Sequence, residues 1–297
     1  MSSGLPRIKP QPIPLFTRLE IESQSNCNRD CWFCARTFDR SGAYKDEVGK
    51  SRIQQMPTET ILDLLDQAQK LNFEGEVSYH FYSEPLLDPR FTYLAREAKR
   101  RGMKIRLHTN GDVLLNNDAL CEEIDDVCDL IVIGIYDYKT EGELEDRKRF
   151  WESRFHGNNL KFSSIKSGGD RSLYSIGVPR ALVPDDERFS VPSLTFQNAP
   201  CQRPLIRMLI RYDGEMSLCC DDITGDFQLG NIYEQSLEAL WYSKKHLKIV
   251  QDLVDGRREL YPLCRVCPLS PSAPSPTGTR IRMKPRKSSV SEFSVSG

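Results

Sequence analysis

The sequence lacks the features that would place the protein in or at a membrane. No apolar run of its 297 residues approaches the length needed to span a bilayer, and its first residues, MSSGLPRIKPQPIPLF, lack the apolar stretch of a signal peptide. Net charge is also nearly absent: the formal charge is −1, so no global field would draw the chain to nucleic acid or lipid. We therefore expect a cytosolic (cytoplasmic) protein, with neither nucleic acid nor a membrane as its partner.

The composition suits a globular fold made of one large domain, or of a domain and a smaller one. Apolar residues make up 39% of the chain and charged residues 28%, which are ordinary values for a soluble protein. Cysteine is the unusual component. The ten cysteines are Cys27, Cys31, Cys34, Cys121, Cys128, Cys201, Cys219, Cys220, Cys264 and Cys267. In a cytosolic protein of this size, they favour metal or redox chemistry over a disulfide framework.

The hydrophobic pattern alternates between the periods of strands and helices. Strands are expected over 16–23, 76–82, 103–109, 129–137, 160–165 and 172–178, and helices over 57–71, 89–102, 117–126 and 141–155. Such alternation indicates βαβ units and a parallel sheet. The sequence therefore predicts an α/β fold, a partial (β/α) TIM-like barrel of five to six parallel strands.

The rhythm changes near residue 183, where prolines interrupt it. Beyond them we expect a β-hairpin over 205–220, around the turn signal Asp213-Gly214, and one amphipathic helix over 236–254. A closing CRVC follows. The predicted units are an extended N-terminal arm (1–15), the barrel (16–182), a small hairpin-plus-helix domain (183–269) and a disordered tail (270–297).

The stretch CNRDCWFC contains Cys27, Cys31 and Cys34 at the spacing C-x3-C-x2-C. A zinc site would need four ligands and a disulfide two, whereas three thiolates can hold three corners of a 4Fe–4S cube and leave one iron open. The spacing, the aromatic Phe33 before the last cysteine, and the position after the first predicted strand resemble the radical S-adenosylmethionine (SAM) superfamily. The alternative is part of a zinc site completed by a distant ligand.

This resemblance implies a 4Fe–4S cluster on these three cysteines at the mouth of the barrel. In the family, the open iron binds SAM, and one electron then cleaves SAM to a 5′-deoxyadenosyl radical, which takes a hydrogen atom from a C–H bond. YSEPLLDP (82–89) stands where the family often has GGEPLL, with Tyr82 and Ser83 in place of two glycines. The resemblance implies that Glu84 hydrogen-bonds the SAM amino group.

Other residues are implied at the SAM site by shorter matches. Phe33 belongs to the cluster motif, and LHTNG (107–111) ends the third strand as the family does, which places His108 and Asn110 near the ribose. Arg180, in VPRAL, resembles an arginine that contacts SAM in related enzymes, although a strand-end salt bridge is the alternative. A structural role is likewise the alternative for His108. Tyr136, Asp137 and Lys139 follow the fourth strand and are candidates for contact with substrate.

A second set consists of Cys201, Cys219, Cys264 and Cys267, with gaps of 18, 45 and 3 residues. The set resembles the twitch domain, a shortened SPASM domain of the same family, and its spacing is similar to that in the family's aminocyclitol dehydrogenases. The resemblance implies a second, auxiliary 4Fe–4S cluster. The alternative is a zinc ribbon, because CxxC with two distant cysteines also suits zinc. Cys121 and Cys128 are expected in the core.

The leading hypothesis is a radical SAM oxidoreductase of natural-product biosynthesis that dehydrogenates a small sugar or aminocyclitol. An auxiliary cluster could accept the electron that is lost when a substrate radical becomes a ketone. The runner-up is a maturase or epimerase of a ribosomally made peptide, in which Cys220 would return a hydrogen atom; a packed free cysteine is the alternative for Cys220. We expect no peptide-recognition domain in the fifteen-residue lead, which favours the small substrate. A flavodoxin or ferredoxin is the expected electron donor. The alternative of a different class is a zinc-stabilised binding module without radical chemistry.

Overall fold

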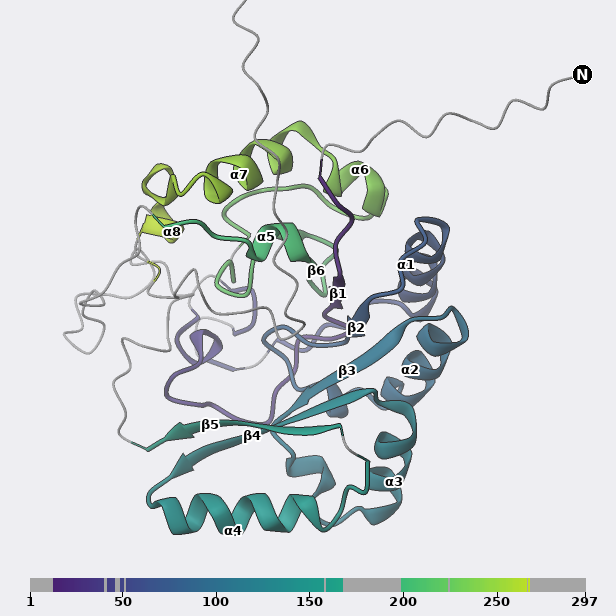
Figure 1. Cartoon of the computed structure of the whole chain (residues 1–297), viewed down its shortest axis with the longest axis vertical. Helices are drawn as coiled ribbons and strands as arrows, with labels where there is room; N and C mark the ends of the chain where they lie inside the picture. The colour runs from purple at the N-terminus through teal and green to yellow at the C-terminus, as the bar shows by residue number, and fades with distance from the viewer. Residues whose placement is uncertain are drawn as a thin grey trace, which may run out of the picture.

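The computed structural model describes residues 13–39, 42–45, 49–50, 52–157, 159–167, 199–223, 225–265 and 267. A seven-stranded sheet in the order β5-β4-β3-β2-β1-β6-β7 forms its framework, and the sheet is not closed (Figure 1). The strands are β1 (Arg18–Ile21), β2 (Glu76–Ser78), β3 (Lys104–Thr109), β4 (Leu130–Tyr138), β5 (Leu160–Lys166), β6 (Arg207–Ile210) and β7 (Met216–Ser217). Neighbouring strands are parallel, except that β6 and β7 are antiparallel. The predicted α/β class with a partial barrel is confirmed.

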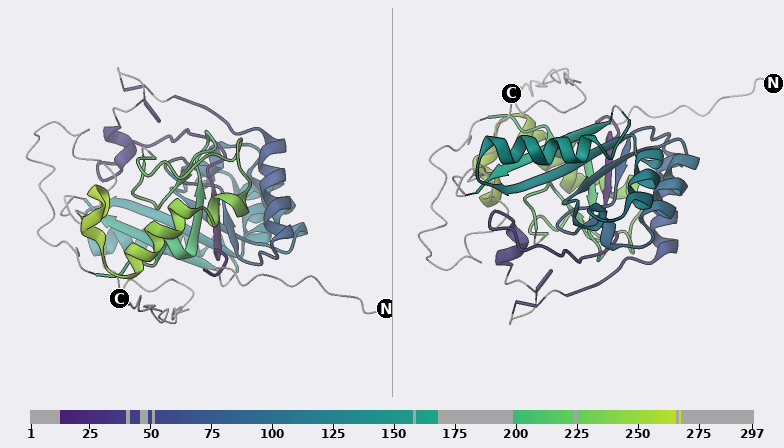
Figure 2. Two further views of the ribbon diagram at one scale, coloured as in Figure 1. Left: turned by 90° about the horizontal axis from the view of Figure 1, so that it is seen from above. Right: turned by 90° about the horizontal axis from the view of Figure 1, so that it is seen from below.

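Four helices follow the first four strands and lie along the outside of the sheet (Figures 1 and 2). They are α1 (Thr58–Lys70), α2 (Phe91–Arg100), α3 (Asp118–Val127) and α4 (Glu141–Glu152). The C-terminal helices are α5 (Arg203–Ile206), α6 (Leu237–Trp241), α7 (Lys244–Val254) and α8 (Pro262–Arg265). Short 3-10 turns are η1 (Ala35–Phe38), η2 (Pro85–Leu87), η3 (Asp112–Leu114) and η7 (Arg258–Leu260). None of the helices in the described ranges is both long and apolar enough to cross a membrane.

The two faces of the sheet differ because side chains alternate along each strand. Leu19, Val77 and Ile105 are fully buried in the hydrophobic core. Their neighbours Arg18 and Glu76 belong to the other face, where Arg18 Nε lies 2.7 Å from Glu76 Oε2. The inner face of the open barrel is therefore lined by charged and polar side chains, which suits an interior that receives a polar ligand.

The predicted hairpin forms around Asp213-Gly214, but its first strand does not stand apart from the barrel. Strand β6 pairs in parallel with β1, so it extends the barrel sheet on the side away from β2. This pairing brings Cys201 and Cys219, which flank the hairpin in sequence, next to the barrel. The predicted strand over 172–178, the boundary at 182/183 and the tail lie outside the described residues.

The helix predicted over 236–254 is wrong as one element, because the chain breaks it between α6 and α7. Ser243 begins α7 as its N-cap, with its Oγ accepting a hydrogen bond from His246 N at 3.2 Å. Trp241, at the end of α6, is fully buried and donates its indole N–H to Pro14 O at 3.1 Å. A serine that satisfies a free backbone N–H favours a new helix start, and both short helices contribute side chains to the hydrophobic core.

Candidate active site

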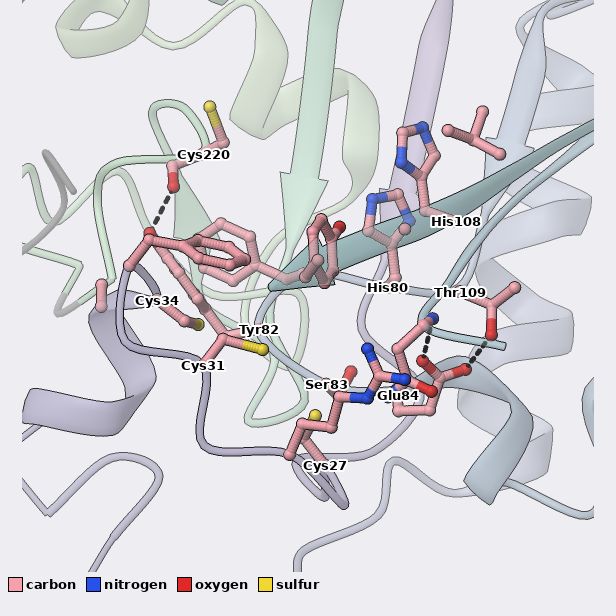
Figure 3. Close-up of a pocket in the computed structure, with 18 of the residues that line it drawn as sticks. Cys27, Cys31, Cys34, His80, Tyr82, Ser83, Glu84, His108, Thr109 and Cys220 are labelled. Carbon is pink, nitrogen blue, oxygen red and sulfur yellow. Dashed lines mark hydrogen bonds between the residues drawn. The ribbon is translucent and has the colours of Figure 1, made fainter. Parts of the chain in front are cut away.

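The first three cysteines lie in the loop after β1 and line one cavity of about 450 Å³ (Figure 3). None of the ten cysteines, all of which the structure describes, forms a disulfide. Burial raises the pKa of Cys31 to about 12 and that of Cys34 to about 11. These thiols therefore keep their protons at neutral pH unless a metal ion takes the proton's place. The predicted set Cys27, Cys31 and Cys34 is thus brought together on one wall.

Polar contacts attach this cysteine loop to the end of β3. The Arg29 guanidinium pairs with the carboxylate of Asp112 through two hydrogen bonds, one of them from Nε to Oδ2 at 2.7 Å. Asn28 Nδ2 donates to Asp112 Oδ2 at 3.0 Å, and Asn110 Nδ2 donates to Asn28 Oδ1 at 2.8 Å. Such a bidentate pair fixes orientation as well as distance, so the loop is held in place before a cofactor binds.

A second attachment joins the loop to the end of β4. Trp32 Nε1 donates to Asp137 Oδ1 at 2.7 Å, and the ring of Phe33 packs edge-on against Tyr136 with centroids 4.8 Å apart. Asp137 has a φ of +62°, a left-handed backbone conformation that residues other than glycine rarely adopt. Asp137 is therefore used to hold Trp32, whereas Tyr136 and Phe33 line the cavity.

Glu84 lies at the start of η2 and connects the ends of β2 and β3. Its carboxylate accepts hydrogen bonds from Thr109 Oγ1 at 2.7 Å, Asn110 N at 2.8 Å and Leu86 N at 3.2 Å. Burial raises the pKa of Glu84, while these hydrogen bonds lower it. A carboxylate has about four acceptor positions, so about one is left to face the cavity. Contact between Glu84 and the SAM amino group remains a prediction that would use this position.

Three further predicted SAM contacts have different outcomes. Ser83 lines the cavity beside Glu84, and its buried Oγ has no hydrogen-bond partner within the described residues (Figure 3). Asn110 lines the cavity too, but its side chain already bonds Asn28 and, through Oδ1, the backbone N–H of Asp112 at 3.0 Å. Arg180 lies outside the described residues. Ser83 is thus the predicted contact with a free polar atom at this wall.

Tyr82, at a position where the family often has glycine, reaches across the cavity wall to Cys220, the neighbour of Cys219 in the second cysteine set. Its hydroxyl donates to Cys220 O at 2.5 Å, although the two residues are 138 positions apart (Figure 3). Its backbone N–H donates to Glu22 Oε1 at 2.9 Å, and its ring lies edge-on to Tyr44 with centroids 5.7 Å apart. The side chain thus links the barrel to the loop that carries Cys219; contact between Tyr82 and SAM remains a prediction.

We expect Tyr82→Phe to weaken this link while keeping the ring. Loss of one buried hydrogen bond should lower the free energy of unfolding by about 1 kcal/mol. The loop of Cys219 should then be less well placed, so more SAM should be cleaved per product molecule formed. The check is urea unfolding together with quantification of 5′-deoxyadenosine and product; an unchanged ratio would mean that the hydroxyl has no role in positioning.

Glu22 supports Tyr82 from inside the protein, and its titration predicts a pH effect on stability. Tyr44 OH donates to Glu22 Oε2 at 2.8 Å, and Arg211 and Tyr212 lie nearby. Burial, opposed by these contacts, raises the pKa of Glu22 to about 7 from 4.5. Because the folded state holds this proton more tightly than the unfolded state, the stabilisation is full below pH 4.5 and is lost as the pH rises through 7.

Glu22→Gln removes this titration, while an amide can still bond Tyr44 and Tyr82. Between pH 6 and pH 8, the wild type should lose about 1 kcal/mol more of its free energy of unfolding than the variant does. Anaerobic urea titrations of both proteins at the two pH values test this. If the free energy of unfolding changes equally in both proteins between the two pH values, the pKa of Glu22 is not raised in the folded state.

The second set also converges, although its members come from three separate places in the chain. Cys201, Cys219, Cys264 and Cys267 line a second cavity, beside the first. Asp221 N donates to Cys219 Sγ at 3.4 Å, a contact that favours a thiolate. In the described part of the chain, no three His, Cys, Asp or Glu side chains are close enough to hold a single metal ion. The four cysteines instead line one small cavity.

Two side chains form a wall that the two cavities share. Arg203 and Asp221 line both, and Arg203 Nη1 lies 3.6 Å from Asp221 Oδ2. Cys220 lines the first cavity, with Arg203 Nη1 lying 3.5 Å from its Sγ. A molecule in the first cavity would therefore have the first cysteine set on one side and, across this wall, the second.

Sequence reasoning missed several residues of the site, among them Thr109, Arg203, Asp221 and His80. Asp221 stands in CCDD and Arg203 two residues after Cys201, so nearness to a predicted ligand was a usable signal for both. Thr109 and His80 gave no such signal in the sequence, because their roles depend on which face of the sheet they occupy. His108, which was expected near the ribose, stacks on His80. It lies within β3, whereas Asn110 follows the end of that strand.

Comparison with known proteins defines the class. The chain matches the model of the radical SAM superfamily over residues 21–156 and that of the SPASM iron–sulfur cluster-binding domain over 201–268. The chain thus contains a radical SAM domain, which implies SAM and a 4Fe–4S cluster, and a SPASM domain, which implies an auxiliary iron–sulfur cluster. The match disfavours a zinc-stabilised binding module.

Among individual proteins, a dehydrogenase is similar over most of its length. The S-adenosyl-L-methionine-dependent 2-deoxy-scyllo-inosamine dehydrogenase of Niallia circulans is 26% identical over 262 residues, which cover 85% of this chain and 93% of the relative. The crystal structure of BtrN in complex with AdoMet and 2-DOIA aligns with a TM-score of 0.65 at 20% identity, covering 85% of this chain and 93% of that one. anSMEcpe with bound AdoMet and the Cp18Cys peptide gives 0.53 at 12% identity, over 86% and 88% of the two chains. These two structures share the fold.

The residues present fit the implied cofactors. Three thiols in one loop leave a cluster one ligand short, and the unpartnered Ser83 Oγ lies on the wall of the same cavity. The second cavity offers four thiols, a complete set for a closed cluster. The first set therefore suits a SAM-binding cluster and the second an auxiliary cluster, and both assignments of ligands remain predictions.

Proposed function

We propose that this radical SAM enzyme oxidises a secondary alcohol of a small cyclic polyol of the aminocyclitol type to a ketone. The observation that carries the proposal is the wall of Arg203 and Asp221, shared by the cavity of the first cysteine set and the cavity of the second. The similarity to a 2-deoxy-scyllo-inosamine dehydrogenase over most of both chains supports this substrate class.

The chemistry requires both sides of the cavity. Oxidation of an alcohol to a ketone removes a hydrogen atom from carbon, a proton from oxygen and one electron. When bound, the SAM-loaded first cluster supplies a 5′-deoxyadenosyl radical that accepts the hydrogen atom, and the auxiliary cluster supplies an acceptor for the electron. The protein's part is to hold the alcohol carbon between the two sets and to keep water out of the cavity.

Named residues divide this work. Glu84 and Ser83 would bind the polar end of SAM, with Phe33 and Asn110 beside them on the same wall. Tyr82 would fix the distance between the two sets through its bond to Cys220 O. Arg203, opposite the buried carboxylate of Asp221, keeps the shared wall closed by an ion pair.

Cys220 is the basis of a second candidate, hydrogen-atom return and therefore epimerisation. Its thiol lines the first cavity, and burial, with the help of Asp221, raises its pKa to about 11. The group is thus an S–H at neutral pH, and an S–H can give a hydrogen atom to a carbon radical. A ketone product favours the first proposal; an epimerised alcohol carrying solvent deuterium favours this one.

The test is turnover of 2-deoxy-scyllo-inosamine with SAM and dithionite under anaerobic conditions. We expect a ketone and 5′-deoxyadenosine in equal amounts, with deuterium from the labelled alcohol carbon recovered in 5′-deoxyadenosine. Absence of this transfer, while SAM cleavage depends on an added peptide, would refute the substrate class. In the cell we propose a cytosolic flavodoxin or ferredoxin as the electron donor in place of dithionite.

A further inference from the structure

A pair of histidines on the cavity wall has no role yet in substrate binding, although the family resemblance implies that His108 lies near the ribose of SAM. His80 and His108 both line the first cavity, and their rings are stacked, with centroids 4.6 Å apart and an angle of 15° between planes (Figure 3). They come from neighbouring strands, since His80 follows β2 and His108 lies in β3. Both lie deeper along the inner face than Glu84 and Asn110, where SAM is expected.

The state of His108 follows from one contact. Arg106 Nε donates to His108 Nε2 at 2.8 Å. An arginine is always protonated and can only donate, so His108 Nε2 must be an acceptor and the ring proton must lie on Nδ1. His108 is therefore neutral and offers an N–H donor on the nitrogen that Arg106 does not use.

His80 has a free polar atom at the same place. Its Nδ1 is buried and has no hydrogen-bond partner within the described residues. Burial lowers the pKa of His80 to about 4, so this ring is neutral as well. A buried polar atom without a partner is costly unless a ligand or a water satisfies it.

The charges around the pair explain why it stays neutral. Arg18, Arg106 and Arg207 come from β1, β3 and β6, whereas their acidic partners are Glu20 on β1 and Glu76 on β2. Three guanidinium groups face two carboxylates, so an imidazolium would add charge of the sign already in excess. This excess of positive charge therefore favours uncharged ligand groups that donate and accept hydrogen bonds.

We propose that His80 and His108 form a hydroxyl-binding floor that orients the ring hydroxyls of a polyol substrate beneath SAM. The inference rests on the proposed substrate class and adds the residues that recognise it. A hydroxyl both donates and accepts, so it can satisfy His80 Nδ1 and accept from His108 Nδ1–H. A protonated amine has no acceptor and is disfavoured by the three arginines, so the amino group of an aminocyclitol would point away from this floor.

The test compares two probes on the reconstituted protein with SAM and without reductant, so that no turnover occurs. Isothermal titration gives the Kd of 2-deoxy-scyllo-inosamine and of cyclohexylamine, a ring amine without hydroxyls. The variants are His80→Phe and His108→Phe, with His80→Asn and His108→Asn as smaller polar replacements. His156→Gln, at an exposed position, is the matched control.

We expect each phenylalanine variant to bind the aminocyclitol about tenfold more weakly, a change of about 1.4 kcal/mol. Cyclohexylamine affinity and iron content should stay unchanged, as should SAM affinity in the His80 variants. The asparagine variants should lose less affinity for the aminocyclitol, and His156→Gln should lose none. If a phenylalanine variant loses iron, the asparagine variant at the same position tests the proposal instead. The proposal then requires that the asparagine variant bind the aminocyclitol more weakly than the His156→Gln control does.

Two contrary results are distinguishable. If the wild type prefers the aminocyclitol and every histidine variant keeps that preference, the pair does not touch the substrate and this inference is wrong, while the proposed function stands. If the wild type does not bind the aminocyclitol more tightly than cyclohexylamine, the proposed substrate class is wrong, and so is the proposed hydroxyl-binding floor.

Discussion

Replacing Cys27, Cys31 and Cys34 together by alanine is expected to reduce SAM cleavage to the level measured without enzyme. These three thiols are the ligands available at the wall that holds Ser83, and no other cysteine of the first cavity is in their loop. Without them, the cluster that delivers the electron to SAM has no protein ligands. The measurement is 5′-deoxyadenosine formed with dithionite over several hours.

The matched control is the double variant Cys121→Ala/Cys128→Ala. Both of these cysteines are buried in the hydrophobic core, as predicted from the sequence, and neither lines the two cavities described here. The control should cleave SAM at the rate of the wild type. Residual cleavage above background in the triple variant would show that SAM is activated elsewhere in the protein.

Replacing Cys201 and Cys219 by alanine is expected to separate SAM cleavage from product formation. The first cysteine set remains, so 5′-deoxyadenosine should still form and the hydrogen atom should still leave the substrate. The ketone should fall from an amount equal to 5′-deoxyadenosine toward none, because the wall of Arg203 and Asp221 would no longer have an electron acceptor behind it.

The same variant also distinguishes the two proposed reactions. Ketone formation at the rate of the wild type would show that the second set does not accept the electron. Formation of an epimer that disappears on the further change Cys220→Ala would favour hydrogen-atom return. Iron content of the variant, which should fall by about four per chain, controls for the loss of the auxiliary cluster alone.

The sequence was sufficient to predict two cysteine sets, the first wholly and the second partly from local spacing. Cys27, Cys31 and Cys34 lie within one loop, and Cys264 and Cys267 within one turn, so their ligand character is visible without a fold. The strand and helix order was likewise readable from hydrophobic period, and the structure confirms the open α/β barrel. Only Cys201 and Cys219 needed the pairing of β6 with β1 to come close.

The contacts that give the site its shape could not be read in this way. The bond from Tyr82 to Cys220 spans 138 positions and depends on how the hairpin meets the barrel. The stacking of His80 on His108 depends on the register between β2 and β3, where one residue of slip would turn each ring to the other face. The break at Ser243 was hidden because the amphipathic pattern continues through it.

The most direct test of the account is the iron and sulfide content after anaerobic reconstitution, for the wild type and for the Cys27→Ala/Cys31→Ala/Cys34→Ala variant. The account predicts about eight irons with equal sulfide in the wild type and about four in the variant, because each 4Fe–4S cluster has its own cysteine set. About four irons in the wild type, all of them lost in the variant, would contradict the auxiliary cluster and with it the oxidation of an alcohol to a ketone.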